Sequence, residues 1–253
     1  METLGVVLDN VEPGQLLLVW GVVIMAAVLR AFSGFGFGLA AVPVFALFMA
    51  PTQAVVLSTS LTLAISLLTL RTYWGGYPPG QMLPMLTLLV VGTGCGAVLL
   101  SQITPAQFRL WIGLLVIAAC IALGLYRPRE RQPGAIMGGL TGLVSGLMNG
   151  AFAVPGPPVI IYAMATQPDG RRSRALLMTF FLFSSVLALL SYGILGFITP
   201  VSPWLFLLAF PAMYIGDKLG YALFRRFGSA FYRRVALGML FALGVAVTAR
   251  ALA

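Results

Sequence analysis

Two glycine- and proline-rich stretches interrupt the apolar segments of this chain, and they hold the residues best suited to bind a ligand. The first extends from Ser33 to Pro43 and the second from Ser145 to Pro158. Proline lacks an amide hydrogen and glycine permits close approach of the backbone, so both residues expose backbone polar groups to a ligand. A helix that begins at such a break carries roughly half a positive charge at its first amides, which suits an anion.

The candidate ligand-binding residues are the glycines, prolines, hydroxyls and amide of these two stretches. They are Ser33, Gly34, Gly36, Gly38, Pro43, Ser145, Gly146, Asn149, Gly150 and Pro155. An alternative interpretation is that the small residues only allow two helices to pack closely, as small residues do in membranes. Their recurrence beside prolines in both halves of the chain favours a binding site.

Arg30 and Asp217 are charged residues within or beside apolar runs. A charge there is costly and usually faces a cavity or a partner. Asp217 could bind a coupling proton or sodium ion, or it could pair with Arg225 near a helix end. Arg30 lies one turn before the first stretch and could either attract an anion or snorkel to the membrane interface as an anchor.

The sequence predicts no metal site, no cofactor and no nucleic-acid partner. It has no histidine, and Cys95 and Cys120 both fall in apolar stretches, which excludes a zinc-ligand set and a histidine base. The net charge of +9 comes from arginines in short clusters between apolar runs. No aromatic and basic patch accompanies these clusters, so they indicate membrane topology rather than nucleic-acid binding.

Composition requires lipid as the solvent of this chain. Its 253 residues are 60% hydrophobic and 8% charged, and the mean hydropathy is +1.02. A spanning helix needs roughly 20 apolar residues, because the hydrocarbon core is about 30 Å thick. The sequence therefore predicts an all-α polytopic membrane protein with about 8 to 10 transmembrane segments.

An internal repeat divides the chain. Ser33 to Pro43 and Ser145 to Pro155 both follow the pattern SGxxxGxxAVP. Self-similarity of this kind predicts two related halves, residues 1–131 and 132–253, within one integral membrane domain, with their helix breaks at equivalent points.

Loop charges predict that these halves are inverted relative to each other. The arginine-rich loops are 127–131, 171–174 and 225–234. Positively charged loops collect on the cytoplasmic side, and all three can lie there only if each half crosses the membrane an odd number of times. Five full crossings per half, or three crossings plus a re-entrant hairpin, satisfy this condition equally.

The glycine-rich stretches resemble those of the sulfite exporter TauE/SafE family, also called the toluene-sulfonate uptake permease family. The resemblance rests on Gly34-Phe35-Gly36-Phe37-Gly38 with Val42-Pro43, and on Gly142-Leu143-Val144-Ser145-Gly146 with Val154-Pro155-Gly156-Pro157-Pro158. With the two-half organisation it covers nearly the whole chain. It implies a permease for sulfite, sulfonates or related small organic anions.

These features predict a secondary transporter, not an enzyme, that moves a small anion across the bacterial inner membrane by alternating access. Replacing Gly38 or Gly150 with valine should abolish transport while the protein still inserts. An anion channel is the main alternative, because a glycine-rich constriction can conduct ions. An intramembrane protease is the second. Gly216-Asp217 matches part of a GxGD motif, but Tyr214 occupies its first glycine position and a second membrane aspartate is missing.

Overall fold

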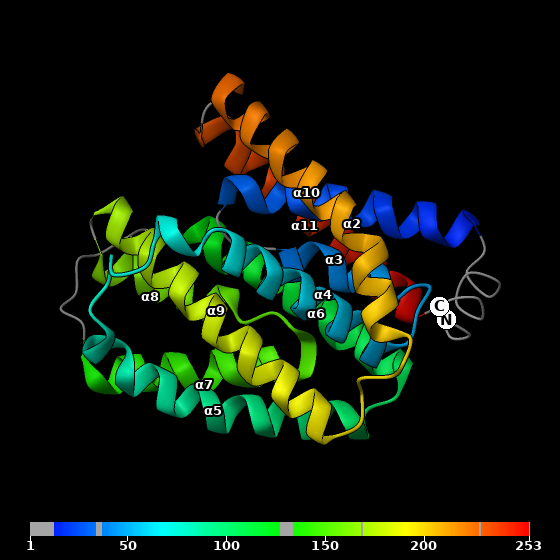
Figure 1. Ribbon diagram of the computed structural model, residues 1–253, viewed down its shortest axis with the longest axis horizontal. Coiled ribbons are helices and arrows are strands. Elements are labelled where there is room, and N and C mark those ends of the chain that lie inside the picture. Colours follow the sequence, from blue (N-terminus) through cyan, green and yellow to red (C-terminus); the bar gives the residue numbers. More distant parts are fainter. Residues whose placement is uncertain (1–12, 34–36, 127–133, 168, 228, 253) are drawn as a thin grey trace.

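The computed structural model describes residues 13–252, except 34–36, 127–133, 168 and 228, and gives the backbone alone at 13, 31–33, 79, 224–227 and 229–234. Within this described part all regular structure is helical, which confirms the all-α prediction (Figure 1). The helices are α2 (Pro13–Ser33), α3 (Phe37–Phe45), α4 (Pro51–Leu68), the 3-10 turn η1 (Leu70–Thr72), α5 (Pro79–Gln102), α6 (Pro105–Leu125), α7 (Ala135–Phe152), α8 (Gly156–Thr166), α9 (Gly170–Ile194), α10 (Ser202–Phe227) and α11 (Ser229–Leu252).

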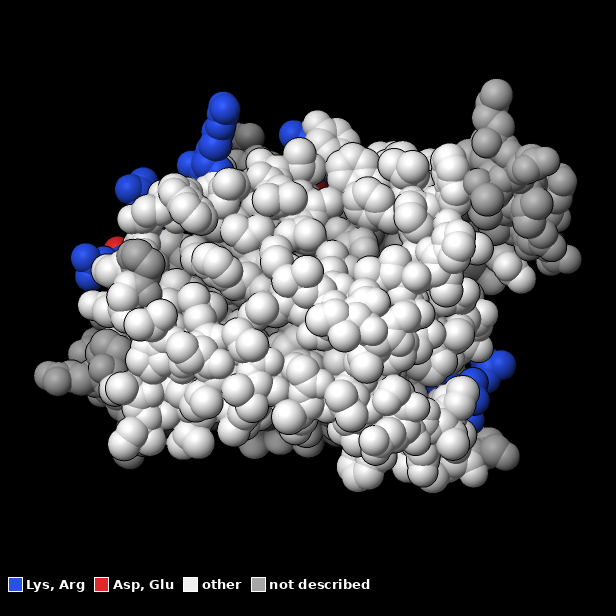
Figure 2. Space-filling model, turned by 60° about the horizontal axis from the view of Figure 1, so that its bottom comes forward, with Lys and Arg blue, Asp and Glu red and all other residues white. Residues whose placement is uncertain are grey.

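The described residues include 6 helices that are long and apolar enough to cross a membrane. They are Pro51–Leu68, Gly80–Gln102, Pro105–Leu125, Ala135–Phe152, Gly170–Ile194 and Val235–Leu252. On the face seen in Figure 2, lysine and arginine side chains lie toward two opposite ends and leave the area between them almost uncharged, which agrees with this. The chain is a polytopic membrane protein.

Two helices are too short to cross a bilayer. Helix α3 has 9 residues and α8 has 11, which correspond to about 14 and 16 Å against a hydrocarbon core of about 30 Å. Each other α-helix has at least 18 residues. In the described part each half therefore has four long helices and one half-length helix. This arrangement is neither five full crossings per half nor three crossings plus a re-entrant hairpin.

The packing of the long helices repeats between the halves. Helix α5 lies along α7, and their counterparts α10 and α2 also lie along each other. Both pairs are parallel. In the first, Gly92 of α5 meets Gly146 of α7, and Gly96 meets Ala151. In the second, Trp20 Nε1 donates a hydrogen bond to the Leu208 carbonyl.

Equivalent helices run in opposite directions, as inverted repeats require. The end of α4 and the start of α9 border one cavity, which is lined by residues such as Thr69 and Arg174. The two helices contact each other and are antiparallel. We call the end of the molecule at Arg71, Arg171, Arg172 and Arg174 the arginine end. The boundary of the halves at residues 131 and 132 stays a prediction.

Close glycine contacts hold α5 against α7. A methyl group on Gly92 would lie 2.9 Å from the Leu147 nitrogen, whereas one on Gly94 would meet nothing within 4 Å. We expect Gly92→Val to destabilise the protein by more than about 2 kcal/mol, because two backbones would have to separate. Gly94→Val, on the same helix, should leave stability unchanged. Thermal unfolding in detergent measures both, and equal unfolding temperatures would contradict this packing.

The prediction that the motif SGxxxGxxAVP marks equivalent helix breaks is wrong by two helical turns. Helix α2 ends at Ser33, but α7 continues past Ser145 to Phe152. It ends at Ala153, which is left-handed with φ 55° and ψ 33°. The physical reason is that Gly146 and Gly150 face the backbone of α5, and this tight packing keeps α7 helical through its glycines.

Candidate functional site

The two half-length helices begin at one small cavity inside the protein. Its volume is about 30 Å³, and it is lined by Arg30, Phe37, Gly38, Leu39, Thr62, Ala153, Val154, Pro155, Gly156 and Phe181. Phe37, Gly38 and Leu39 form the first turn of α3, and Gly156 is the first residue of α8. The starts of α3 and α8, which belong to different predicted halves, therefore meet at this cavity.

The two short helices diverge from this cavity. Helix α3 ends at Phe45, which lies in one hydrophobic core, whereas α8 leads to Tyr162 in the other core. Just beyond α8, Gln167 Nε2 donates to the Tyr77 hydroxyl over 3.4 Å, near the arginine end. Both N-terminal ends thus face the cavity, and the positive ends of both helix dipoles favour a negative charge there.

A close backbone contact joins the two breaks. A methyl group built on Gly38 would overlap the carbonyl oxygen of Ala153 and would come within 3.6 Å of Ser58 Oγ. Only glycine fits at this point. The left-handed conformation of Ala153 is uncommon for a residue with a side chain and costs roughly 1–2 kcal/mol, so the surrounding structure must hold the turn in place.

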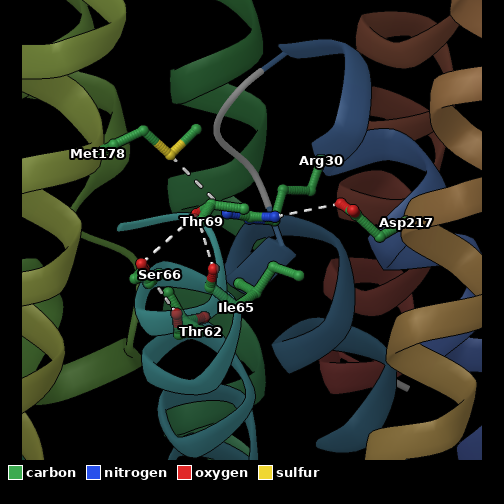
Figure 3. A network of polar contacts seen from close by, with 7 residues as sticks. All are labelled: Arg30, Thr62, Ile65, Ser66, Thr69, Met178 and Asp217. Atoms are coloured by element: carbon green, nitrogen blue, oxygen red, sulfur yellow. Dashed lines mark hydrogen bonds and ion pairs between the residues drawn. The ribbon is translucent and has the colours of Figure 1, made fainter. Parts of the chain in front are cut away.

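Arg30 supplies the positive charge of the cavity. Its side chain is 7% exposed. Nη1 lies 3.4 Å from Asp217 Oδ1, and Nη2 donates to Met178 Sδ over 3.8 Å (Figure 3). A guanidinium has five N–H donors, and both of these interactions are long or weak. As far as the described residues go, Arg30 therefore retains hydrogen-bonding capacity for an anion.

Helix α4 adds hydroxyl groups beside the cavity. Thr62 lines it, but its hydroxyl donates to the Ser58 carbonyl over 2.8 Å. Ser66 in turn donates to the Thr62 carbonyl over 2.8 Å (Figure 3). The Ser58 hydroxyl is buried and has no hydrogen-bond partner among the described residues. Since a buried polar group without a partner is costly, Ser58 is a further donor available close to Gly38.

The structure brings together three of the predicted binding and charge residues directly: Arg30, Gly38 and Pro155. Asp217 joins them through its contact with Arg30, so the two charged candidates form one pair. The alternative partner of Asp217, the side chain of Arg225, lies outside the described residues.

The other predicted residues lie elsewhere. Gly146 and Gly150 contact the backbone of α5, as the alternative packing interpretation expects. Asn149 Nδ2 donates to the Ser184 carbonyl over 2.8 Å and so ties α7 to α9. Ser145 and Pro43 are buried but do not line the cavity. Gly34, Gly36 and the side chain of Ser33 lie outside the described residues.

Sequence reasoning missed several residues of the cavity. Thr62, Phe181 and Gly156 line it, and Met178 contacts Arg30. Gly156 follows the second break directly, so its place at a helix start could have been found. Nothing in the sequence distinguishes Phe181 or Met178 from other apolar residues of α9.

A second, larger cavity opens at the arginine end. It has a volume of about 630 Å³ and is lined by Thr69, Thr72, Tyr73, Trp74, Gly76, Arg171, Arg172, Arg174 and Ala175. Burial raises the pKa of Tyr73, and the positive charge of Arg30 opposes this rise. Arg30 is therefore close enough to act electrostatically on the wall of this vestibule.

The fold and the site define a multi-pass membrane protein in which two broken helices present their positive ends to a buried cavity. The family model described as Sulfite exporter TauE/SafE matches residues 19–247. The chain belongs to this family, whose members are membrane transporters. Neither the curated proteins nor the solved structures contain a match.

A protease site finds little support in this geometry. Asp217 is paired with Arg30. The only other aspartate in the described part of the chain, Asp169, is exposed and caps α9 by accepting a hydrogen bond from the Arg171 amide over 2.9 Å. An aspartyl protease needs two carboxylates that share a proton.

Proposed function

We propose that this chain is a secondary transporter for a small oxyanion, such as sulfite or an organic sulfonate, in the bacterial inner membrane. The anion binds between the starts of α3 and α8 and forms hydrogen bonds to backbone amides there and to Arg30. The observation that carries this proposal is that one cavity is lined by both helix starts and by a buried guanidinium. Helix dipoles and an arginine favour the same sign of charge.

The size of the cavity supports a carrier rather than an open pore. A volume of about 30 Å³ holds about two water molecules, since each needs at least roughly 10–15 Å³ by this measure. A four-atom oxyanion requires the surrounding helices to move apart. Alternating access supplies such a movement, because one half rocks against the other around a fixed site.

The vestibule gives the anion a route from the arginine end, which we place on the cytoplasmic side by the positive-inside rule. Arg171, Arg172 and Arg174 lie within the first five residues of α9 and line the vestibule. Positive charge at a helix N-terminus is unfavourable for the helix itself. It attracts anions, however, and raises their concentration at the entrance.

Counterflow in proteoliposomes tests the proposal. Vesicles that contain the purified protein and unlabelled sulfite should take up external radiolabelled sulfite faster than vesicles loaded with chloride. A carrier accelerates exchange because the loaded site reorients quickly. A channel gives no such acceleration, so equal uptake by the two sets of vesicles would favour the channel. Absence of protein-dependent uptake of sulfite, methanesulfonate and acetate would contradict an oxyanion transporter.

A further inference from the structure

The ion pair at the cavity connects the two halves of the chain. Arg30 belongs to α2 and Asp217 to α10. These helices touch at backbone distance next to the pair, because a methyl group on Gly216 would lie 2.8 Å from the Ile24 carbonyl oxygen. The Asp217 backbone is thus fixed relative to Arg30, and only the short carboxylate side chain is free to change its position.

The two members of the pair differ in their surroundings. The Arg30 side chain is 7% exposed and that of Asp217 is 30% exposed, and 3.4 Å separates Nη1 from Oδ1. This distance exceeds the roughly 2.7–2.9 Å of a close charge-assisted hydrogen bond. The guanidinium is therefore held in the interior, whereas the carboxylate can turn away from it toward the outside of the helix.

No other described residue can supply the negative charge that Asp217 provides to Arg30. Lys218 is the next residue, but its Nζ lies 5.4 Å from the centre of the Tyr214 ring, and neighbouring helical residues point in different directions. Arg174 and Tyr73 also act electrostatically on Arg30. Neither supplies a negative charge while the tyrosine is protonated.

We propose that Asp217 is the resident counter-ion of Arg30 and that the transported anion displaces it. This inference rests on the proposed function. In the empty carrier the carboxylate neutralises the guanidinium. When an oxyanion enters the cavity it takes over the Arg30 donors, and the carboxylate turns outward. When the anion leaves, the carboxylate returns.

The counter-ion decides whether the carrier can return empty. A buried guanidinium without a partner is strongly unfavourable in a membrane protein. With Asp217 present, the empty site is neutral and can reorient, so net transport is possible. Without it, the site is compensated only while an anion is bound, and the carrier can exchange anions but cannot move them in one direction.

Asp217→Asn tests this inference, with Asp169→Asn as the matched control. Asparagine caps a helix about as well as aspartate, so the control should behave as the wild type. Vesicles loaded with radiolabelled sulfite are diluted either into sulfite-free buffer or into unlabelled sulfite. For Asp217→Asn we expect exchange within about twofold of wild type, but net efflux at least tenfold slower, which is about 1.4 kcal/mol.

Binding provides a second readout. Since the carboxylate competes with the anion, purified Asp217→Asn should bind sulfite at least about tenfold more tightly than wild type. A purely structural role predicts weaker binding. Unchanged net efflux, an equal loss of both transport modes, or unchanged binding would overturn the inference. Wild-type protein that exchanges no sulfite would instead refute the proposed function itself.

A double variant tests the inference in case Asp217→Asn does not fold. Arg30→Gln with Asp217→Asn leaves neither charge unpaired, so it should accumulate in the membrane and bind no sulfite. Sulfite binding by this double variant would also overturn the inference.

Discussion

Arg30→Gln should reduce sulfite transport at least about 100-fold. Glutamine removes the charge and most of the N–H donors of this cavity-lining side chain. Two charge-assisted hydrogen bonds at about 1.5–3 kcal/mol each amount to at least about 3 kcal/mol, and every 1.4 kcal/mol corresponds to a factor of about ten. Initial rates of counterflow at several sulfite concentrations measure the effect.

The control for this experiment is Arg250→Gln. Arg250 is an exposed arginine in the last turn of α11, so its replacement removes the same charge far from the cavity. It should transport as the wild type does. Arg30→Lys keeps a charge without the planar fork of donors, and we expect it to transport at an intermediate rate. Full transport by Arg30→Gln would show that Arg30 does not bind the anion.

Gly38→Ala should reduce transport at least about tenfold, because the added methyl group overlaps the Ala153 carbonyl oxygen and forces the two breaks apart. Overpacking of this kind typically costs 1–3 kcal/mol. A displaced start of α3 no longer aims its amides at the same point as α8. Counterflow rates and the apparent affinity for sulfite should both fall.

Gly124→Ala is the matched control for that variant. A methyl group on Gly124, near the end of α6, would meet nothing within 4 Å. Both variants should elute as single peaks in detergent, which separates a local effect on the site from unfolding. Wild-type rates for Gly38→Ala would mean that the contact between the breaks has no role in transport.

Gly150→Val no longer tests the binding site. A side chain at Gly150 would meet the Ala97 nitrogen at 2.6 Å, so this substitution separates α5 from α7. The sequence pattern could not distinguish the two roles, because four-residue glycine spacing serves both helix packing and ligand contact. The partner glycines at positions 92 and 96 have the same spacing, and they were the available indication of a packing role.

The fold class and the broken helices follow from local properties of the sequence, namely long apolar runs and clusters of glycine and proline. The charge pattern of the loops also predicts antiparallel equivalent helices, because it depends only on which end each loop reaches. The pairing of Arg30 with Asp217 does not follow from local pattern. The two residues are 187 positions apart, and only the packing of α2 on α10 brings them together.

The proline pair at the start of α8 makes the two halves unlike at the cavity. Pro157 and Pro158 carry no amide hydrogen, so Gly156 is the only one of the first three residues of α8 that can donate. The first half contributes Phe37, Gly38 and Leu39, each of which has an amide hydrogen, together with Arg30.

The second half contributes mainly the apolar groups of Val154, Pro155 and Phe181. An organic sulfonate has an ionic head and an apolar body. If the proposed function holds, we therefore expect a sulfonate to bind with its head toward the first half and its body toward the second.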